Sequence, residues 1–114
     1  MERVPTGMGQ ERRSDAGRIT PGWRLKHRRG QLGWTQLTLA NRLQEVGAWY
    51  RGGPKFTSSL ISMISRWERD EIVPDAYNAH VLAEALFLEV GELGFPIDPH
   101  YMHPPRRRTP LPIG

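Results

Sequence analysis

The stretch SMISRWERDEIVP, residues 62–74, joins an apolar helix face to a dense group of charges. Ile64 and Trp67 are three positions apart, so a helix places both side chains on one face. Glu68 follows Trp67 directly and lies near the boundary of the expected core. A buried carboxylate without a partner is costly. We therefore expect a basic partner for Glu68, and Arg29 on the first helical segment is the best candidate.

The composition of the chain limits the classes of protein to which it can belong. Its 114 residues suit one small domain. The absence of cysteine excludes disulfides, thiolate zinc sites and cysteine nucleophiles. No apolar run approaches the ~20 residues of a membrane span, and the N-terminus lacks the apolar segment of a secretory signal. A cytoplasmic protein is expected, and a net charge of +4 favours an anionic partner.

Three regions follow from the distribution of glycine and proline. Residues 1–20 show no periodicity and are expected to form a flexible N-terminal arm. Residues 96–114 hold six prolines, which favours an extended and flexible tail. The folded domain is therefore expected to span residues 21–95.

Apolar residues within 21–95 recur with helical spacing, which predicts an all-α bundle of four or five short helices. Pro21 is suited to open the first helix, Thr35 to cap the second, Thr57 or Ser58 to cap the third, and Asp75 to cap the fourth. The residues expected to face inward include Trp23, Leu25 and Leu32 on the first helix, Leu39, Ala40, Leu43 and Val46 on the second, Leu60, Ile64 and Trp67 on the third, and Tyr77, Val81, Leu82, Ala85 and Leu86 on the fourth. A short fifth turn would carry Val90, Leu93 and Phe95.

Two segments, GWTQLTLANRL at 33–43 and ISRWERDEIVPDAYNAHVLAEAL at 64–86, resemble the phage-repressor (XRE, lambda-repressor-like) helix-turn-helix family. The resemblance covers about residues 24–95. Its matching residues are Gly33, Thr35, Gln36, Leu39, Ala40, Ile64, Ser65, Trp67, Glu68, Pro74, Leu82, Ala83 and Leu86.

The resemblance implies roles for individual residues. Gln36 would contact a DNA phosphate and support the recognition helix, while Arg29 and Glu68 would form a buried structural ion pair. The third helix would meet the major groove with Ser58, Ser59, Ser62, Met63, Ser65, Arg66 and Arg69. Arg51 and Lys55, in the loop before that helix, could add charge on a phosphate.

The chain departs from the family pattern in three places. More residues separate the second and third helices in this sequence than in the family pattern, which implies an insertion at residues 47–56. Ile61 and Met63 stand where polar base-reading residues are usual; they could contact thymine methyl groups, but Ile61 could equally pack against the inserted loop. Asp70 replaces the glycine that ends the recognition helix, and aspartate tolerates the left-handed conformation better than most residues.

Charge is unevenly distributed along the domain. Residues 22–69 carry a net charge of +7, and residues 70–95 carry −6. Such polarity is typical of a domain that turns one basic face toward a polyanion. The run of arginines at 106–108 is either a DNA-clamping tail or a solubilising segment.

These observations predict a sequence-specific regulator, bacterial or phage-encoded, that binds double-stranded DNA and represses transcription by occupying an operator. The alternatives are an antitoxin-like protein-interaction module with secondary DNA binding, and a nucleoid- or RNA-associated protein. The sequence shows no nucleophile–base constellation and no metal-ligand pattern, so no enzyme, cofactor, metal site or small-molecule substrate is expected. A weak homodimer could use Leu88, Val90, Leu93 and Phe95, although these side chains could instead close the monomer core.

Overall fold

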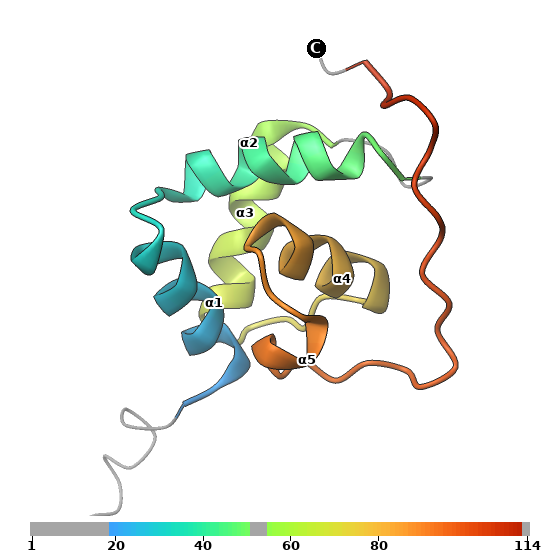
Figure 1. Ribbon diagram of the computed structural model, residues 1–114. Coiled ribbons are helices and arrows are strands. Elements are labelled where there is room, and N and C mark those ends of the chain that lie inside the picture. Colours follow the sequence, from blue (N-terminus) through green and yellow to red (C-terminus); the bar gives the residue numbers. More distant parts are fainter. Residues whose placement is uncertain (1–18, 51–54, 113–114) are drawn as a thin grey trace, which may run out of the picture.

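The computed structural model describes residues 19–50 and 55–112, and these residues form helices without any strand (Figure 1). The helices are α1 (Pro21–Gln31), α2 (Gln36–Gly47), α3 (Thr57–Glu68), α4 (Ala76–Ala85) and α5 (Val90–Leu93). The prediction of a compact all-α domain is confirmed for this part of the chain. Most of the expected N-terminal arm, residues 1–18, lies outside it.

The starts of three helices follow from local capping. The hydroxyl oxygens of Thr20 and Thr35 accept hydrogen bonds from the backbone N–H groups of Trp23 and Thr38 at the starts of α1 and α2. The carboxylate of Asp75 does the same for α4. The expected caps Thr35 and Asp75 are thereby confirmed.

The start of α3 differs from the expectation. Phe56 occupies the capping position and is 82% exposed, and Thr57 is already the first helical residue. No side chain accepts from the first turn of α3, so the expected hydroxyl cap from Thr57 or Ser58 is absent. Phe56 has extended backbone angles, with φ −63° and ψ 139°, and the helix begins directly after it at Thr57.

The core lies where α2, α3 and α4 meet around Trp67, which is 1% exposed. Buried with it are Leu25, Leu39, Ala40, Leu43, Val46, Tyr50, Leu60, Ile64, Ala79, Val81, Leu82, Ala83, Ala85, Leu86, Leu93 and Phe95. This set contains most residues that helical spacing assigned to the inside.

Trp23 is a correction to that assignment. Its side chain is 44% exposed and stacks on His27, with 4.5 Å between ring centroids. Successive helical residues are about 100° apart around the axis. Trp23 therefore points nearly opposite to Leu25, and burying Leu25 turns Trp23 toward solvent.

Helices α1 and α3 approach each other most closely at Gly22. A Cβ at this position would lie 2.6 Å from the carbonyl oxygens of Trp67 and Glu68. Asp70, in the left-handed conformation with φ 56°, places its carboxylate against the start of α1. This carboxylate accepts hydrogen bonds from the Gly22 N–H at 2.9 Å and from the Thr20 hydroxyl at 2.6 Å.

Two of the four residues considered for a dimer contact are unavailable. Leu93 is fully buried and Phe95 is 6% exposed, so both close the core of the monomer. Leu88 and Val90 are partly buried and pack against the same core. The apolar patch expected at this end of the domain is therefore largely used within the chain.

The C-terminal segment is extended, as its prolines predict, but it does not leave the domain. Residues 96–112 contain no helix and run beside α4 to the end of α2 (Figure 1). The N–H groups of Arg107 and Leu111 donate to the carbonyl oxygens of Trp49 and Ala48, at 2.7 and 2.8 Å. Side chains at the end of α2 and on α4, which are distant in sequence, hold this segment against the domain. The segment is therefore not a free tail.

The two glycines of α1 are predicted to respond oppositely to alanine. Gly22→Ala should lower the free energy of unfolding by on the order of 3 kcal/mol, because the added methyl group meets backbone atoms that cannot move aside. Gly30→Ala meets nothing within 4 Å and should raise it by about 0.5–1 kcal/mol. Urea denaturation of both variants measures the difference, and equal effects would contradict the close approach of α1 and α3.

Candidate nucleic-acid interface

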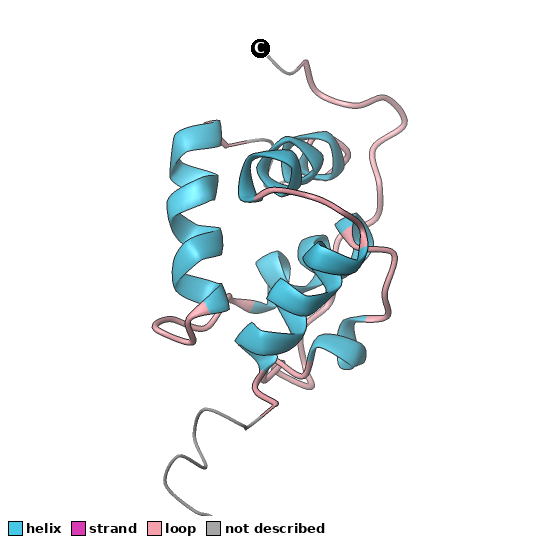
Figure 2. Ribbon diagram, turned by 90° about the vertical axis from the view of Figure 1, so that its left-hand side faces the viewer, coloured by secondary structure: helices cyan, strands magenta, loops and turns pink. Residues whose placement is uncertain are grey.

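The outer face of α3 carries a polar stripe. Ser58, Ser62 and Arg66 recur at four-residue intervals and are all exposed, with Ser59 and Arg69 beside them. Leu60, Ile64 and Trp67 occupy the opposite face and are buried. Figure 2 shows α3 at the edge of the bundle, with one side open along its length.

The two arginines of this stripe differ in their partners. Arg69 forms an exposed ion pair with Glu71, with 2.8 Å between Nε and a carboxylate oxygen. Arg66 forms no side-chain hydrogen bond or ion pair with the residues that the structure describes. Its guanidinium, with five donors, is therefore free to meet a ligand.

Met63 and Ser65 flank the stripe and are half-buried. Met63 and Ile61 both pack against the core, so Ile61 is a packing residue and the reach of Met63 outward is limited. The structure thus brings together Ser58, Ser59, Ser62, Arg66 and Arg69 on the open face and sets Met63 and Ser65 at its margin.

The first turn of α3 opens onto the same face. Because no side chain caps it, backbone N–H groups at this end have no partner from the cap. Free N–H groups and the positive end of the helix dipole favour an anion such as a phosphate. Ser58 and Ser59 stand in this turn and add hydroxyl donors.

A buried hydrogen-bond network fixes the other end of α3. Arg29 Nε lies 2.6 Å from one carboxylate oxygen of Glu68, and Arg29 Nη2 donates to the other at 3.0 Å. Arg29 Nη1 donates to the backbone carbonyl of Trp34 at 2.8 Å. The side chain of Glu68 is 3% exposed. The predicted pair is present, and its two-point geometry is the strong form of a charged contact.

Gln36 belongs to this network. Its amide nitrogen donates to the Glu68 carboxylate at 3.0 Å, so one carboxylate joins α1, α2 and α3. The hydrogen bonds with Glu68 raise the pKa of Arg29 more strongly than burial lowers it. The guanidinium therefore remains charged, and Gln36 supports the end of α3 through Glu68.

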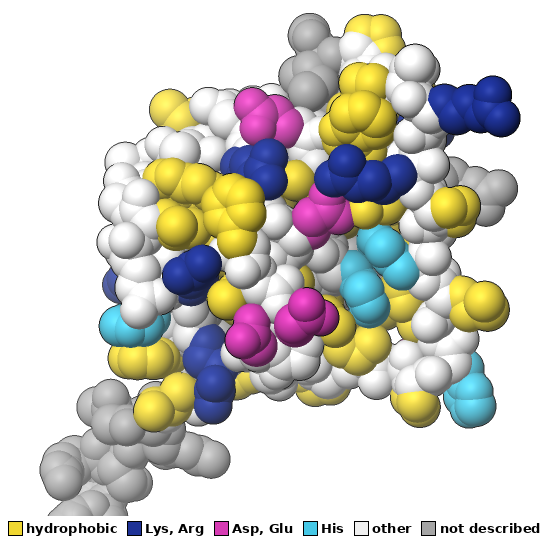
Figure 3. Space-filling model, in the orientation of Figure 1, with side chains coloured by type: hydrophobic (Ala, Val, Ile, Leu, Met, Phe, Trp, Pro, Cys, Tyr) yellow, Lys and Arg dark blue, Asp and Glu magenta, His cyan; other side chains and the backbone are white. Residues whose placement is uncertain are grey.

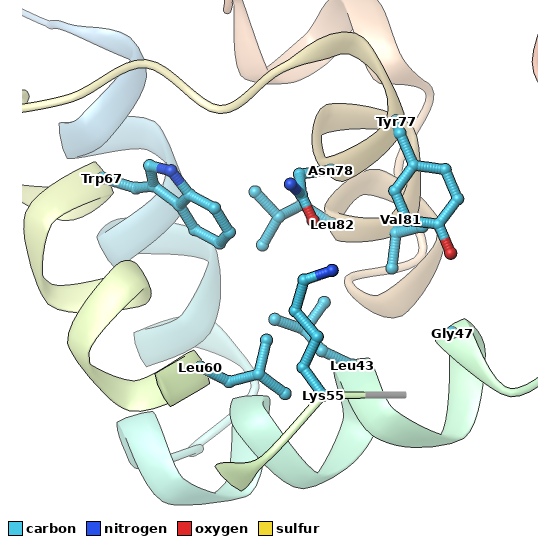
Figure 4. Close-up of a pocket in the computed structure, with 9 residues that line it drawn as sticks. All are labelled: Leu43, Gly47, Lys55, Leu60, Trp67, Tyr77, Asn78, Val81 and Leu82. Atoms are coloured by element: carbon cyan, nitrogen blue, oxygen red, sulfur yellow. The ribbon is translucent and has the colours of Figure 1, made fainter. Parts of the chain in front are cut away.

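Of the two loop residues expected to touch a phosphate, the structure describes Lys55. Arg51 lies outside the described residues. Lys55 extends from the start of α3 toward α4, over the side of α3 that faces the core (Figure 4). There it borders a cavity of about 10 Å³ lined by Leu43, Leu60, Trp67, Val81 and Leu82, among others. This cavity is no larger than a single water requires and offers no room for a ligand.

Two arginines counted toward the expected basic face make contacts within the domain. Arg28 and Arg42 donate to the carbonyl oxygens of Leu86 and Ala85, at 3.0 and 3.3 Å, at the end of α4. Cations are favourable at a helix C-terminus, where carbonyl groups lack partners. Figure 3 shows basic and acidic side chains interspersed on the face that carries α4. On this face, charges that are separated along the sequence are mixed in space.

Sequence reasoning missed two contacts of this site. The carboxylate of Asp70 ties the end of α3 to the start of α1, and the amide of Gln36 reaches Glu68. The left-handed position expected at Asp70 was a signal for the first, because a side chain retained there in place of glycine needs a role. The contact between Gln36 and Glu68 depends on how α2 and α3 are placed relative to each other, and no local sequence pattern indicates it.

Comparisons with known proteins do not assign the chain to a family. A scan against protein-family models, a search of curated proteins and a search of solved structures each returned no match. Within residues 19–50 and 55–112, no cluster of histidine and carboxylate side chains is arranged to hold a metal ion. In the same residues, every helix is too short or too polar to cross a bilayer.

Breaking the buried ion pair is predicted to destabilise the domain more than removing it. Arg29→Met and Glu68→Leu should each lower the free energy of unfolding by on the order of 3 kcal/mol, because each leaves a buried charge unpaired. The double variant should cost clearly less than the sum of the two. Gln36→Ala should cost about 1 kcal/mol through one lost hydrogen bond.

Chemical denaturation of these four variants, in parallel with Lys26→Met as an exposed control on α1, provides the measurement. The control should stay within about 0.5 kcal/mol of the parent. Strictly additive losses for Arg29→Met and Glu68→Leu would show that the two side chains do not interact.

Proposed function

We propose that this protein is a sequence-specific regulator that binds double-stranded DNA and inserts α3 into the major groove. The observation that carries the proposal is the contrast between the two faces of α3. Its outer face bears an exposed stripe of serine and arginine, while its end is fixed by the buried Glu68 network. A helix with an open polar face and a fixed orientation is suited to recognise one defined surface of a partner.

The dimensions and chemistry of the stripe fit duplex DNA. The major groove is about 12 Å wide and admits one α-helix. Ser58 and Ser62 offer hydroxyl groups that donate or accept at base edges. Arg66 offers the two-point donor geometry that suits the O6 and N7 atoms of guanine.

Phosphate contacts would set the register of the helix on the duplex. The uncapped start of α3, with Ser59, presents donors at one end of the stripe. At the other end lies Arg69, whose exposed pair with Glu71 contributes little, so a phosphate can replace the carboxylate. Gln36 opens α2 near the same network and could donate to a phosphate only by sharing its amide with Glu68.

Operator occupancy is the simplest regulatory action of such a domain. A protein bound across a promoter blocks access of the polymerase without any catalytic group. The burial of Leu93 and Phe95 argues against a dimer contact through α5. We therefore propose a repressor that acts by occupancy.

Arg66→Ala is predicted to weaken DNA binding without destabilising the fold, because the side chain has no partner in the described part of the chain. Binding sites would first be selected from random duplex DNA, and affinity then measured by fluorescence anisotropy over a range of salt concentrations. If Arg66 meets a base, the variant should lose about 1–3 kcal/mol of discrimination at one position. If it meets a phosphate, the log–log salt slope should become less negative by about 0.9.

Arg24→Ala is the matched control. It removes the same charge from an exposed position beside Gly94, next to α5 and away from α3. It should change specificity little. Selection that enriches no sequence, together with equal affinities of parent and Arg66→Ala, would reject the proposal and favour a protein-interaction module.

A further inference from the structure

The C-terminal segment docks through an aromatic and histidine cluster on the far side of the bundle from α3. His103 stacks on His80 of α4, with 4.7 Å between ring centroids and 17° between planes. The same ring lies 4.7 Å from the ring of Tyr50 and accepts or donates a 2.9 Å hydrogen bond with the Tyr101 hydroxyl. His103 is therefore the central side chain of this contact.

Arg106 adds a charged contact. Its guanidinium pairs with the carboxylate of Glu84 on α4 and lies 5.1 Å from the centroid of the Trp49 ring. The Tyr50 hydroxyl donates to the other carboxylate oxygen of Glu84 at 2.5 Å. Together with the two backbone hydrogen bonds of Arg107 and Leu111, these contacts hold the segment from residue 101 to residue 111.

We propose that residues 101–111 form a pH-released strap, which is docked on α4 and the end of α2 at neutral pH and detaches when His103, stacked on His80 of α4, becomes protonated. The geometry carries this inference. Two imidazole rings in face-to-face contact cannot both take a proton without placing like charges at the distance of a ring stack. Histidine is also the side chain that changes charge between pH 5 and 8.

The surroundings of His103 oppose its protonation. Burial lowers the pKa of His103 below its ordinary value of 6.5, and the neighbouring His80 lowers it further. Glu84 acts in the opposite direction but does not reverse the shift. His80 Nδ1 meets the Ala76 carbonyl at 2.9 Å, and because a carbonyl can only accept, this nitrogen carries a hydrogen.

Glu84, Tyr50 and Tyr101 do not change charge in the same range. Burial alone would raise the pKa of Glu84, but hydrogen bonds from Tyr50 and Arg106 outweigh it and lower the pKa of this carboxyl. Burial raises the pKa values of Tyr50 and Tyr101 above 10.0, so both phenols remain neutral. The groups that face His103 are His80, Tyr77 and Glu84 from α4, Tyr50 from the end of α2, Glu89 from the α4–α5 connection, and Tyr101 and Arg106 from the strap itself.

The sign of the pH dependence follows from the lowered pKa. The docked strap binds fewer protons than the released one. Docking is therefore strongest above the ordinary pKa of 6.5 and weakens as the pH falls through and below it. Release would expose Tyr50 and His80 and free the arginine run at residues 106–108 for an anionic partner.

Amide NMR of the full-length protein tests the strap without any DNA, so its outcome is independent of the proposed function. The reporters are the N–H groups of Arg107 and Leu111, with the core amide of Ala40 as the internal reference. At pH 7.5 both reporters should be protected from hydrogen exchange. Between the two pKa values of His103, the docking constant should fall by about tenfold per pH unit, and protection should fall with it.

Variants identify the responsible side chain. His103→Phe keeps an aromatic ring without a titrating group, so its reporters should stay protected at pH 5. His100→Phe makes the same change at an exposed histidine of the same segment and should release like the parent. A second neutral variant, His103→Gln, shows whether docking at pH 7.5 needs only an uncharged side chain.

Three results would overturn the proposal. They are full protection of the parent at pH 5, release of His103→Phe with the pH dependence of the parent, and loss of docking at pH 7.5 in both His103→Phe and His103→Gln. The first two would show that protonation of His103 does not control the strap. The third would show that docking depends on the contacts of the imidazole ring and not on its charge.

Discussion

The carboxylate of Glu68 is the point on which the arrangement of the first three helices depends. It is nearly inaccessible to solvent, yet it accepts hydrogen bonds from Arg29 on α1 and Gln36 on α2. A buried charge tolerates little displacement from its partners, because any separation leaves it unsatisfied. The network therefore acts as a constraint on direction as well as a source of stability, and it aims the outer face of α3. The close packing at Gly22 supports the same junction.

Much of the fold could be predicted because its signals are local. Thr35 and Asp75 act on N–H groups three residues away, so their capping roles can be recognised in the sequence alone. The inward positions of Leu60, Ile64 and Trp67 follow from helical spacing. The partner of Glu68 could be predicted as well, since a carboxylate beside a core tryptophan requires a base, and Arg29 was the candidate offered by the neighbouring helix.

What could not be predicted depends on contacts between distant segments. Nothing local indicates that Arg28 and Arg42 bind the end of α4 instead of joining a basic face. Likewise, prolines forecast an extended chain from residue 96 onward but not the surface along which it lies, which His80 and Glu84 supply from α4. In the candidate site, the polar stripe on α3 could be predicted from helical spacing. Only the structure shows that Arg69 in this stripe is paired with Glu71 and that Arg66 is unpaired among the residues it describes.

The separation of the α3 stripe from the buried network has a consequence for how such a protein can diversify. Ser58, Ser62 and Arg66 point to solvent, while the contacts that place the helix come from Trp67, Glu68 and Gly22. Exchanges along the stripe therefore leave the frame of the domain intact. A lineage of such proteins could therefore vary the exposed residues of α3 one at a time, with each intermediate still able to fold.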